Sequence, residues 1–290
     1  MAEPVVMYGI GATKAGTSWL YRYLAAHPDC YLRSIKELHF FDAREQDSRD
    51  WYLKQLKNAG ASLGRRIASG QGGENGQASL HLAEIGIYSN ILRKGDETAY
   101  LAFLQDGRED ERVVGDITPS YSLLSAECLA HMAKIAGDAR FVYLMRDPVD
   151  RLWSHVRMIA RRRSKDGSDI PERAARIFDK TLDGQEEHIV ERGDYRATLE
   201  KLEMTLDPDR VFLCTYEELF SDAALDRLCE FLGIRPMPGD YDTCVHTGIP
   251  VPMTADQKQR AAKFLRPQYD YVASKLGQMP RGWGAAMAGA

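Results

Sequence analysis

Residues 4–26 read PVVMYGIGATKAGTSWLYRYLAA, and this stretch decides the fold. Its first eight residues are an apolar run that ends in glycines, which is typical of a strand buried on both faces in a parallel sheet. Residues 17–26 carry Leu20, Tyr23 and Leu24 at helical spacing, and the sequence His27-Pro28 ends the expected helix. A strand, a glycine loop and a helix open a βαβ fold, so we predict an α/β protein.

The rest of the chain repeats this alternation. Apolar runs at residues 112–115, 139–145 and 211–215 predict further buried strands, and helical spacing predicts helices over residues 80–92 and 98–104. Pro148 suits the first turn of another helix, and Gly233 closes a later one. Strands that alternate with helices predict a three-layer α/β fold with a central parallel sheet flanked by helices.

One stretch interrupts this pattern. Residues 60–76 are rich in Gly, Ser and Gln and have no apolar period, so we expect a mobile surface loop there. We interpret it as a lid edge or linker and not as a boundary between independent domains. The chain is therefore expected to form a single domain over residues 1–290.

Composition excludes several classes of protein. The 290 residues include 38 Lys+Arg and 42 Asp+Glu, a formal net charge of −4, whereas a dedicated nucleic-acid binder would normally show a basic excess. The sequence starts without the positive charge of a signal peptide and contains no apolar run long enough to span a membrane. Its five cysteines form no close pair, which favours reduced thiols over a zinc site. We expect a cytoplasmic globular protein.

The glycine loop at residues 11–18 favours a phosphate group. The dinucleotide pattern G-x-G-x-x-G begins at Gly9 and Gly11 but has Lys14 at its third glycine. The Walker A pattern fits Gly11, Gly16 and Ser18 but has Thr17 at its lysine. Loop N–H groups and the helix dipole would still bind an anion. Hydrolysis of ATP with Mg²⁺ is not favoured, and a tight turn with a surface lysine is the structural alternative.

The loop resembles the 5′-phosphosulfate loop of sulfotransferases that use 3′-phosphoadenosine 5′-phosphosulfate (PAPS). The resemblance implies that Lys14 stabilises the leaving phosphate and so acts in catalysis. It also implies a P-loop NTPase-like fold and no requirement for a metal. The residues that it assigns to the nucleotide in this segment are Lys14, Ala15, Gly16, Thr17, Ser18 and Trp19. Trp19 would stack on adenine, although a core aromatic position is an equal alternative.

A second motif supplies the other end of the nucleotide. Residues 146–154, RDPVDRLWS, resemble the family's 3′-phosphate motif R-D-P-x-x-R-x-x-S. An arginine that leaves the carboxyl end of a strand can bind a phosphate with two N–H groups, and ligands of open α/β sheets bind at such ends. The resemblance assigns Arg146 and Ser154 to the 3′-phosphate, and leaves Arg151 as a structural ion-pair partner. Tyr216 would contact adenine or pack in the core.

The segment IKELHFFD at residues 35–42 is similar to K-E-x-H-F-F-D of the heparan sulfate and other carbohydrate sulfotransferases. That resemblance makes Glu37 the general base, with His39 as the second choice and Lys36 as a charge near the transferred group. In an extended segment, Glu37 and His39 would project to the same side. A half-buried strand with a solvated Lys-Glu pair is the structural alternative.

The segment VGDITPSY at residues 114–121 looks like the family's G-E-K-T-P-x-Y stretch on the acceptor side. It assigns Asp116, Thr118 and Tyr121 to substrate binding. Ile117 replaces the lysine, which argues against a highly sulfated polysaccharide and leaves a neutral sugar, a lipid or a small alcohol. The basic residues 157–165 are expected to form a solvated helix end, or else to guide an anionic acceptor. The family's basic C-terminal loop should lie near residues 247–250.

We therefore predict a PAPS-dependent sulfotransferase that transfers a sulfonate group to a hydroxyl, or less favourably an amine, of a small-molecule, carbohydrate or lipid acceptor. It would release adenosine 3′,5′-bisphosphate by in-line displacement. Two alternatives stay open. One is an ATP-dependent P-loop kinase, for which Asp116 is the nearest candidate for a Mg²⁺ carboxylate, and the other is a nucleotide-binding module without catalysis.

Overall fold

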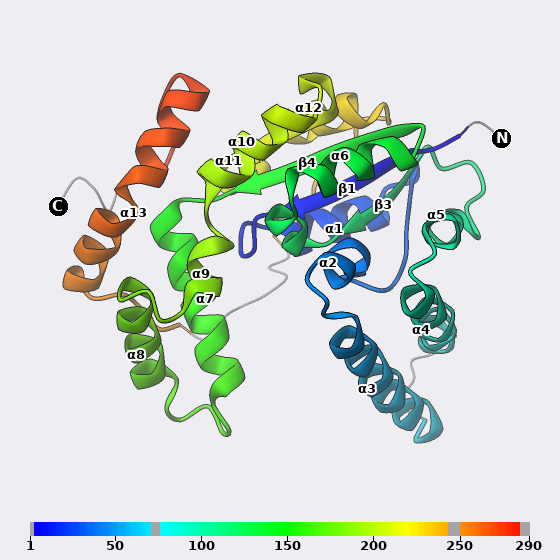
Figure 1. Ribbon diagram of the computed structural model, residues 1–290, viewed down its shortest axis with the longest axis horizontal. Helices are drawn as coiled ribbons and strands as arrows, with labels where there is room; N and C mark the ends of the chain where they lie inside the picture. The colour runs from blue at the N-terminus through cyan, green and yellow to red at the C-terminus, as the bar shows by residue number, and fades with distance from the viewer. Residues whose placement is uncertain (1–2, 71–75, 243–249, 285–290) are drawn as a thin grey trace.

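A computed structural model describes residues 3–70, 76–242 and 250–284. Its centre is a five-stranded sheet in which every pair of neighbouring strands is parallel, in the order β2-β3-β1-β4-β5 (Figure 1). The strands are β1 (Val5–Gly11), β2 (Cys30–Leu32), β3 (Val113–Ile117), β4 (Asp138–Met145) and β5 (Val211–Thr215). Helices lie on both faces of this sheet (Figure 1), and the three-layer α/β prediction is confirmed.

The helices connect the strands and extend beyond them. In the first half of the chain they are α1 (Thr17–Ala26), α2 (Phe40–Glu45), α3 (Arg49–Ala68), α4 (Gln77–Lys94), α5 (Glu97–Gln105), the 3-10 helix η1 (Pro119–Leu123) and α6 (Ala126–Ile135). In the second half they are α7 (Pro148–Arg163), α8 (Ile170–Leu182), α9 (Glu187–Glu191), α10 (Tyr195–Thr205), the 3-10 helix η2 (Pro208–Arg210), α11 (Tyr216–Leu219), α12 (Asp222–Leu232) and α13 (Ala255–Leu276).

The strands are buried for the reason that their sequences suggested. In β1, Val6 to Gly11 are all buried, because a central parallel strand is covered by helices on both faces. β3 is longer than the predicted 112–115 strand, and therefore Asp116 and Ile117 belong to the sheet and not to a turn. Ile117 packs against Gly9, where an added Cβ would lie 2.8 Å from its Cγ1. Only glycine at position 9 leaves room for this neighbour.

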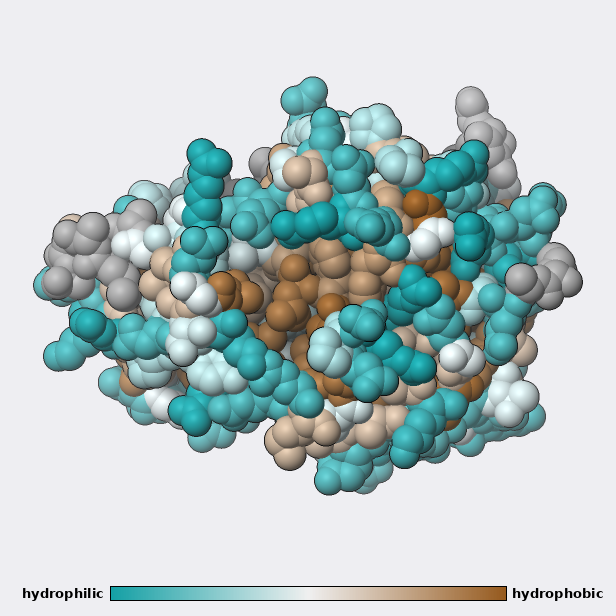
Figure 2. Space-filling model, turned by 90° about the horizontal axis from the view of Figure 1, so that it is seen from above, coloured by the Kyte–Doolittle hydropathy of each residue, from teal (hydrophilic) through white to brown (hydrophobic). Residues whose placement is uncertain are grey.

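The buried apolar side chains form one continuous cluster that includes residues of all five strands and most of the helices. In a view from above, apolar side chains gather in the middle of the face and hydrophilic side chains surround them (Figure 2). None of the helices in the described segments is both long enough and apolar enough to cross a membrane.

The prediction of a loop over residues 60–76 is wrong for residues 60–68, which are helical. α3 continues through Gly60 and Gly64 to Ala68 and packs against α4. Both glycines face α4: a Cβ at Gly60 would lie 3.4 Å from Ile85 and one at Gly64 would lie 3.9 Å from Leu82, which are ordinary contact distances. Residues 71–75 lie outside the described part of the chain, and α4 begins directly after Gly76. Gly60 and Gly64, which suggested a loop, therefore lie inside a helix.

Candidate active site at the carboxyl ends of the strands

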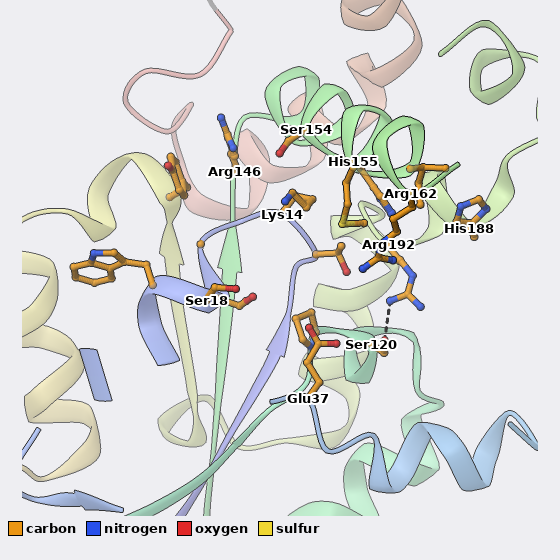
Figure 3. A pocket seen from close by; sticks show the side chains of 18 of the residues that line it. Lys14, Ser18, Glu37, Ser120, Arg146, Ser154, His155, Arg162, His188 and Arg192 are labelled. Carbon is orange, nitrogen blue, oxygen red and sulfur yellow. Dashed lines mark hydrogen bonds between the residues drawn. The ribbon is translucent and has the colours of Figure 1, made fainter. Parts of the chain in front are cut away.

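A cleft of about 710 Å³ lies beyond the carboxyl ends of the central strands. Its walls come from the loop after β1, from α3, η1, α7 and α9, and from the start of α11. Lys14, Ser18, Arg146, Ser154 and Glu37 all line this cleft, and Figure 3 shows them around it. Open parallel sheets bind ligands at this edge, because the loops that follow neighbouring strands converge there.

The glycine loop is held in a conformation that favours binding of an anion. Lys14 and Gly16 have φ values of 73° and 98°, in the left-handed region. A Cβ on Gly16 would lie 3.0 Å from the ring of Tyr216, so the loop needs glycine at this position for two reasons. The N–H groups of Lys14, Gly16 and Thr17 donate to no other described residue. They lie at the N-terminus of α1, where the helix dipole favours negative charge.

The loop residues contribute unequally. Lys14, Gly16, Thr17 and Ser18 line the cleft, whereas the side chain of Ala15 is fully buried and leaves only its backbone for a ligand. Burial lowers the pKa of Lys14, and the nearby positive charges of Arg146, Arg157 and Arg162 lower it further. Since several cations converge on one cleft, an anion that binds there would relieve their mutual repulsion.

Arg146 and Ser154 meet on the other side of the loop (Figure 3). Arg146 follows β4 directly, and its guanidinium lies 4.5 Å from the ring centre of Tyr216. Its Nε is buried and has no hydrogen-bond partner within the described segments. An unpaired buried donor is costly, and a phosphate oxygen would satisfy it. Ser154 lines the same cleft from α7.

The remaining polar residues of the 146–154 motif support the fold. Asp147 caps α7 by accepting from the N–H groups of Val149 and Asp150, and it also accepts from Tyr269. Arg151 is buried, and its guanidinium donates to the carbonyl of Ile189 at 2.9 Å. The expectation of an ion pair for Arg151 differs from this finding, since its guanidinium contacts a carbonyl and the Nδ1 of His155.

Two aromatic residues lie at the same end of the cleft. Trp19 lines the cleft but is 7% exposed, and its ring stacks with those of Tyr23 and Tyr241. Its indole N–H donates to the carbonyl of Asp240 at 3.0 Å. Trp19 therefore combines the two interpretations of its sequence position, a packed core aromatic with one surface toward the cleft. Tyr216 also lines the cleft and holds the Arg146 side chain.

Glu37 and His39 meet, although the segment is not extended at His39, which has a left-handed φ of 57°. His39 lies with Nε2 3.2 Å from Oε2 of Glu37 and with Nδ1 2.8 Å from Oδ2 of Asp42. Although burial lowers the pKa of His39, the hydrogen bonds to the two carboxylates raise it to about 9. Burial also raises the pKa of Glu37, but the His39 hydrogen bond and the charge of Lys36 lower it overall. Near neutral pH the pair is therefore imidazolium and carboxylate.

Lys36 lies apart from the main cleft. Its Nζ is 3.6 Å from Oε1 of Glu37, and it lines a neighbouring pocket of about 380 Å³. Burial lowers its pKa, against the effect of Glu37, which raises it. The two pockets share Glu37, His39, Trp51 and Tyr52. Glu37 is thus reachable from two directions.

Asp116, Thr118 and Tyr121 are buried and do not line the cleft, which differs from the expected contact with an acceptor. Asp116 accepts hydrogen bonds from Thr118 at 2.7 Å and from Tyr121 at 2.6 Å. With their protons directed at this carboxylate, both hydroxyl oxygens are free to accept. The Thr118 hydroxyl accepts from the N–H of Leu38 at 3.1 Å, and the Tyr121 hydroxyl accepts from the N–H of Phe40 at 3.0 Å. The three residues position the backbone on both sides of His39.

Further residues, which no sequence pattern indicated, line the cleft opposite the glycine loop. Arg192 follows α9 and donates to Oγ of Ser120 at 2.8 Å, an interaction drawn as the dashed line in Figure 3. Trp51 and Tyr52 come from the start of α3, and His155 and His188 from α7 and α9. A weak signal existed for Arg162, which belongs to the basic run expected at a solvated helix end. Arg162 lines the cleft, whereas Arg163 pairs with Glu186.

Ile117, from which the charge of the acceptor was inferred, does not line the cleft. Ile117 is 3% exposed and packs against Gly9 in the sheet, so its side chain does not reach the cleft. The charge of the cleft is set instead by Lys14, Arg146, Arg162 and Arg192. The basic C-terminal loop expected near residues 247–250 falls mostly on residues 243–249, outside the described part of the chain.

Comparison with known proteins places the chain among sulfotransferases. A model of the sulfotransferase family matches residues 6–238. A solved sulfotransferase from Alicyclobacillus acidocaldarius has the same fold, with a TM-score of 0.66 at 22% identity over 98% of this chain and 99% of that one. No curated protein matches.

Two solved domains match less well. The sulfotransferase domain of the Synechococcus PCC 7002 olefin synthase has a TM-score of 0.48 at 20% identity, covering 91% of this chain and 96% of that one. The sulfotransferase domain from the curacin biosynthetic pathway also has a TM-score of 0.48, at 16% identity, covering 96% of this chain and 98% of that one.

Proposed function

Since this chain belongs to the sulfotransferase family, we propose that it transfers a sulfonate group from PAPS to a hydroxyl group of an acceptor. The observation that carries the proposal is a single cleft that contains two separate anion sites and is also lined by the carboxylate of Glu37. The glycine loop with Lys14 is the first site, and Arg146 with Ser154 is the second. A nucleotide with phosphates at both its 5′ and 3′ positions needs two such sites.

The residues present fit this nucleotide. At the 5′ end, the N–H groups of Lys14, Gly16 and Thr17 donate to no other described residue. At the 3′ end, Nε of Arg146 is a buried donor without a partner among the described residues. Trp19 and Tyr216 would border the adenine. We assign the 5′-phosphosulfate to residues 14–18 and the 3′-phosphate to Arg146 and Ser154.

When bound, PAPS supplies the sulfonate group and a bisphosphate leaving group. Lys14 places a positive charge at the loop that binds the 5′ end, where it would stabilise negative charge that develops during transfer. Glu37 is ionised and would accept the proton of the acceptor hydroxyl. Asp116, Thr118 and Tyr121 act at a distance from the reaction, by fixing the backbone that carries Glu37 and His39.

Of the two candidate bases, Glu37 is favoured over His39. Both ring nitrogens of His39 face carboxylate oxygens, and the pKa of His39 is raised to about 9 despite its burial. A histidine that already holds a proton on each nitrogen cannot accept another. His39 instead orients Glu37 and keeps its carboxylate ionised.

Ligand binding separates the proposal from the kinase alternative. The melting temperature is measured with adenosine 3′,5′-bisphosphate, ADP or Mg·ATP, each at the same excess. A ligand at about 100 times its dissociation constant stabilises the protein by roughly 2.7 kcal/mol, which corresponds to a shift of a few degrees in a chain of this size. We expect the bisphosphate to give the largest shift. A shift no larger than that with ADP would refute the assignment to PAPS.

The structure does not support Asp116 as the Mg²⁺ ligand of a kinase. Asp116 was the carboxylate nearest to a Walker B position, but it is 2% exposed and its oxygens accept from three hydroxyl groups. It does not face the cleft and so offers no ligand to a bound Mg²⁺. A binding module without catalysis would have no use for the ionised Glu37, and the first prediction of the Discussion tests that alternative.

A further inference from the structure

Three basic side chains line the cleft on the side of α7 and α9, away from Trp19 and Tyr216. They are Arg162, His188 and Arg192, and Figure 3 shows them together near His155. The two sites assigned to the nucleotide use other residues, Lys14 and residues 15–18 at one end and Arg146 with Ser154 at the other. His188 lies 3.6 Å from a carboxylate oxygen of Glu186, so the two arginines of this group are the ones that need a separate explanation.

Arg192 is fixed in place but is not neutralised. It is half-buried, and its Nη1 donates to the neutral hydroxyl of Ser120, itself 2% exposed. No carboxylate within the described ranges lies within ion-pair distance of Arg192 or Arg162. Their neighbour Arg163, in contrast, is paired with Glu186. An arginine has five N–H donors, so Arg192 keeps four for a ligand.

The position of Arg192 next to the base has an electrostatic cost. The pKa of the neighbouring His155 is lowered to about 2, first by burial and then by the charges of Arg151 and Arg192. Burial raises the pKa of Glu37, whereas His39 and Lys36 lower it, and Arg192 adds a smaller lowering effect. A lower pKa makes Glu37 a weaker base. A negatively charged group bound beside Arg192 would offset this effect.

We propose that Arg192 and Arg162, assisted by His188, bind an anionic group of the acceptor, so that the substrate is a hydroxyl compound that also carries a carboxylate, phosphate or sulfate. This inference rests on the proposed sulfonate transfer. Arg192 is the specificity-determining residue, because Ser120 holds its guanidinium in one place. Arg162 is exposed at the end of α7 and would add charge at the entrance.

The opposite wall suggests the shape of the rest of the acceptor. Trp51 is 57% exposed although it is a large aromatic, and it lines both the cleft and the neighbouring pocket next to Tyr52. An exposed aromatic surface beside a base can stack on a sugar or an aromatic ring. Between this surface and Arg192, the hydroxyl group of a ring compound with an acidic substituent could reach Glu37.

The test uses paired probes that differ in one charge. Glucuronate is compared with glucose, and 4-hydroxyphenylacetate with 4-hydroxyphenylacetamide. Dissociation constants are measured by calorimetry or ligand-observed NMR, with the protein alone and with saturating adenosine 3′,5′-bisphosphate. The variants are Arg192→Gln, Arg162→Gln and the double variant. The matched control is Arg161→Gln, which removes the same charge from an exposed neighbour that does not line the cleft.

In the wild type, the carboxylate member of each pair should bind at least about tenfold more tightly than its neutral partner, since hydrogen bonds between ions are strong. Arg192→Gln should reduce this preference to less than about threefold, Arg162→Gln should reduce it by a smaller factor, and Arg161→Gln should leave it unchanged. The dissociation constant of the bisphosphate should stay within about twofold in all variants.

Two results would overturn the inference. The first is equal binding of the charged and neutral probes by the wild type. The second is a loss of bisphosphate affinity in Arg192→Gln as large as that in Arg146→Ala, which would make Arg192 part of the nucleotide site. If the bisphosphate does not bind to the wild type at all, the proposed function fails. The probe preference of the protein alone still decides the inference about Arg192 and Arg162.

Discussion

The two halves of the cleft are built in different ways. The phosphate sites of the nucleotide half consist of two short continuous segments, residues 13–18 after β1 and residues 146–154 after β4, to which Trp19 and Tyr216 add the aromatic end of the cleft. The acceptor half is formed by one or two residues from each of five places along the chain. They are Glu37 and His39, Trp51 and Tyr52, Ser120, Arg162, and His188 with Arg192.

This difference follows from what each half binds with. The nucleotide half uses backbone N–H groups, a helix N-terminus and the residue directly after a strand, and each of these is a local property of the chain. The acceptor half uses side chains that meet only after α3, α7 and α9 have packed around the sheet. Local backbone features are visible as a sequence motif, whereas a surface assembled from distant residues has no such motif.

The largest expected effect separates the halves at Glu37. Glu37→Gln removes the base but keeps the shape of the side chain, so turnover should fall by about 10²- to 10⁴-fold. The dissociation constant of adenosine 3′,5′-bisphosphate should change little, because Glu37 lies outside both phosphate sites. Transfer from labelled PAPS and calorimetry of bisphosphate binding measure the two quantities.

Glu84→Gln is a suitable control for this change. Glu84 is also a half-buried carboxylate in an ion pair, with Arg33, but it does not line the cleft. Its loss should not reduce turnover by more than the loss of folded protein explains. Full activity in Glu37→Gln would make His39 the base and would break the division of roles proposed for this pair.

The next effect belongs to the nucleotide half. Arg146→Ala should weaken binding of adenosine 3′,5′-bisphosphate by about 1.5–3 kcal/mol, the range for hydrogen bonds to charged groups. Binding of adenosine 5′-phosphate, which has no 3′-phosphate, should hardly change. Arg140→Ala is the control, because Arg140 is on the same strand but pairs with Asp138 near its amino end. Equal losses for the two nucleotides would refute the assigned 3′-phosphate site.

The same division explains which parts of the fold and site could be predicted. The ends of α1, β5 and α12 follow from apolar spacing and glycines, and they agree with the sequence-based expectation. Gly60 and Gly64 led to a wrong loop, because glycine composition does not distinguish a loop from a tightly packed helix pair. Thr118 and Tyr121 match a motif but serve a buried network, since a motif shows which residues recur and not what they touch.

A smaller effect tests that buried network. Tyr121→Phe and Tyr100→Phe each remove a hydroxyl that donates to Oδ2 of Asp116, but only the Tyr121 hydroxyl also accepts from the N–H of Phe40. Each change should lower the free energy of unfolding by about 1–3 kcal/mol. Tyr121→Phe should in addition lower kcat several-fold with little change in the KM of the acceptor. Urea titrations and steady-state kinetics on both variants measure this.

These outcomes distinguish a positioning residue from one that contacts the substrate. If Tyr121→Phe raises the acceptor KM and leaves kcat unchanged, Tyr121 binds the acceptor directly, as its motif suggested. If both tyrosine variants lower kcat by the same factor, the hydrogen bond to Phe40 has no special role, and the effect comes from Asp116.

The smallest effect concerns the contact of His39 with the carboxylates beside it. Its pKa is raised to about 9 in the folded protein from an ordinary value of 6.5. The stabilisation is therefore complete below pH 6.5 and is lost as the pH rises through about 9. We expect the difference in unfolding free energy between the wild type and His39→Gln to shrink by about 1–2 kcal/mol over this range. One pKa unit corresponds to about 1.4 kcal/mol, and partial solvent access reduces the effect. Parallel curves in urea titrations from pH 6 to 10 would mean that His39 is neutral, and Glu37 would then lose its preference over His39 as the base.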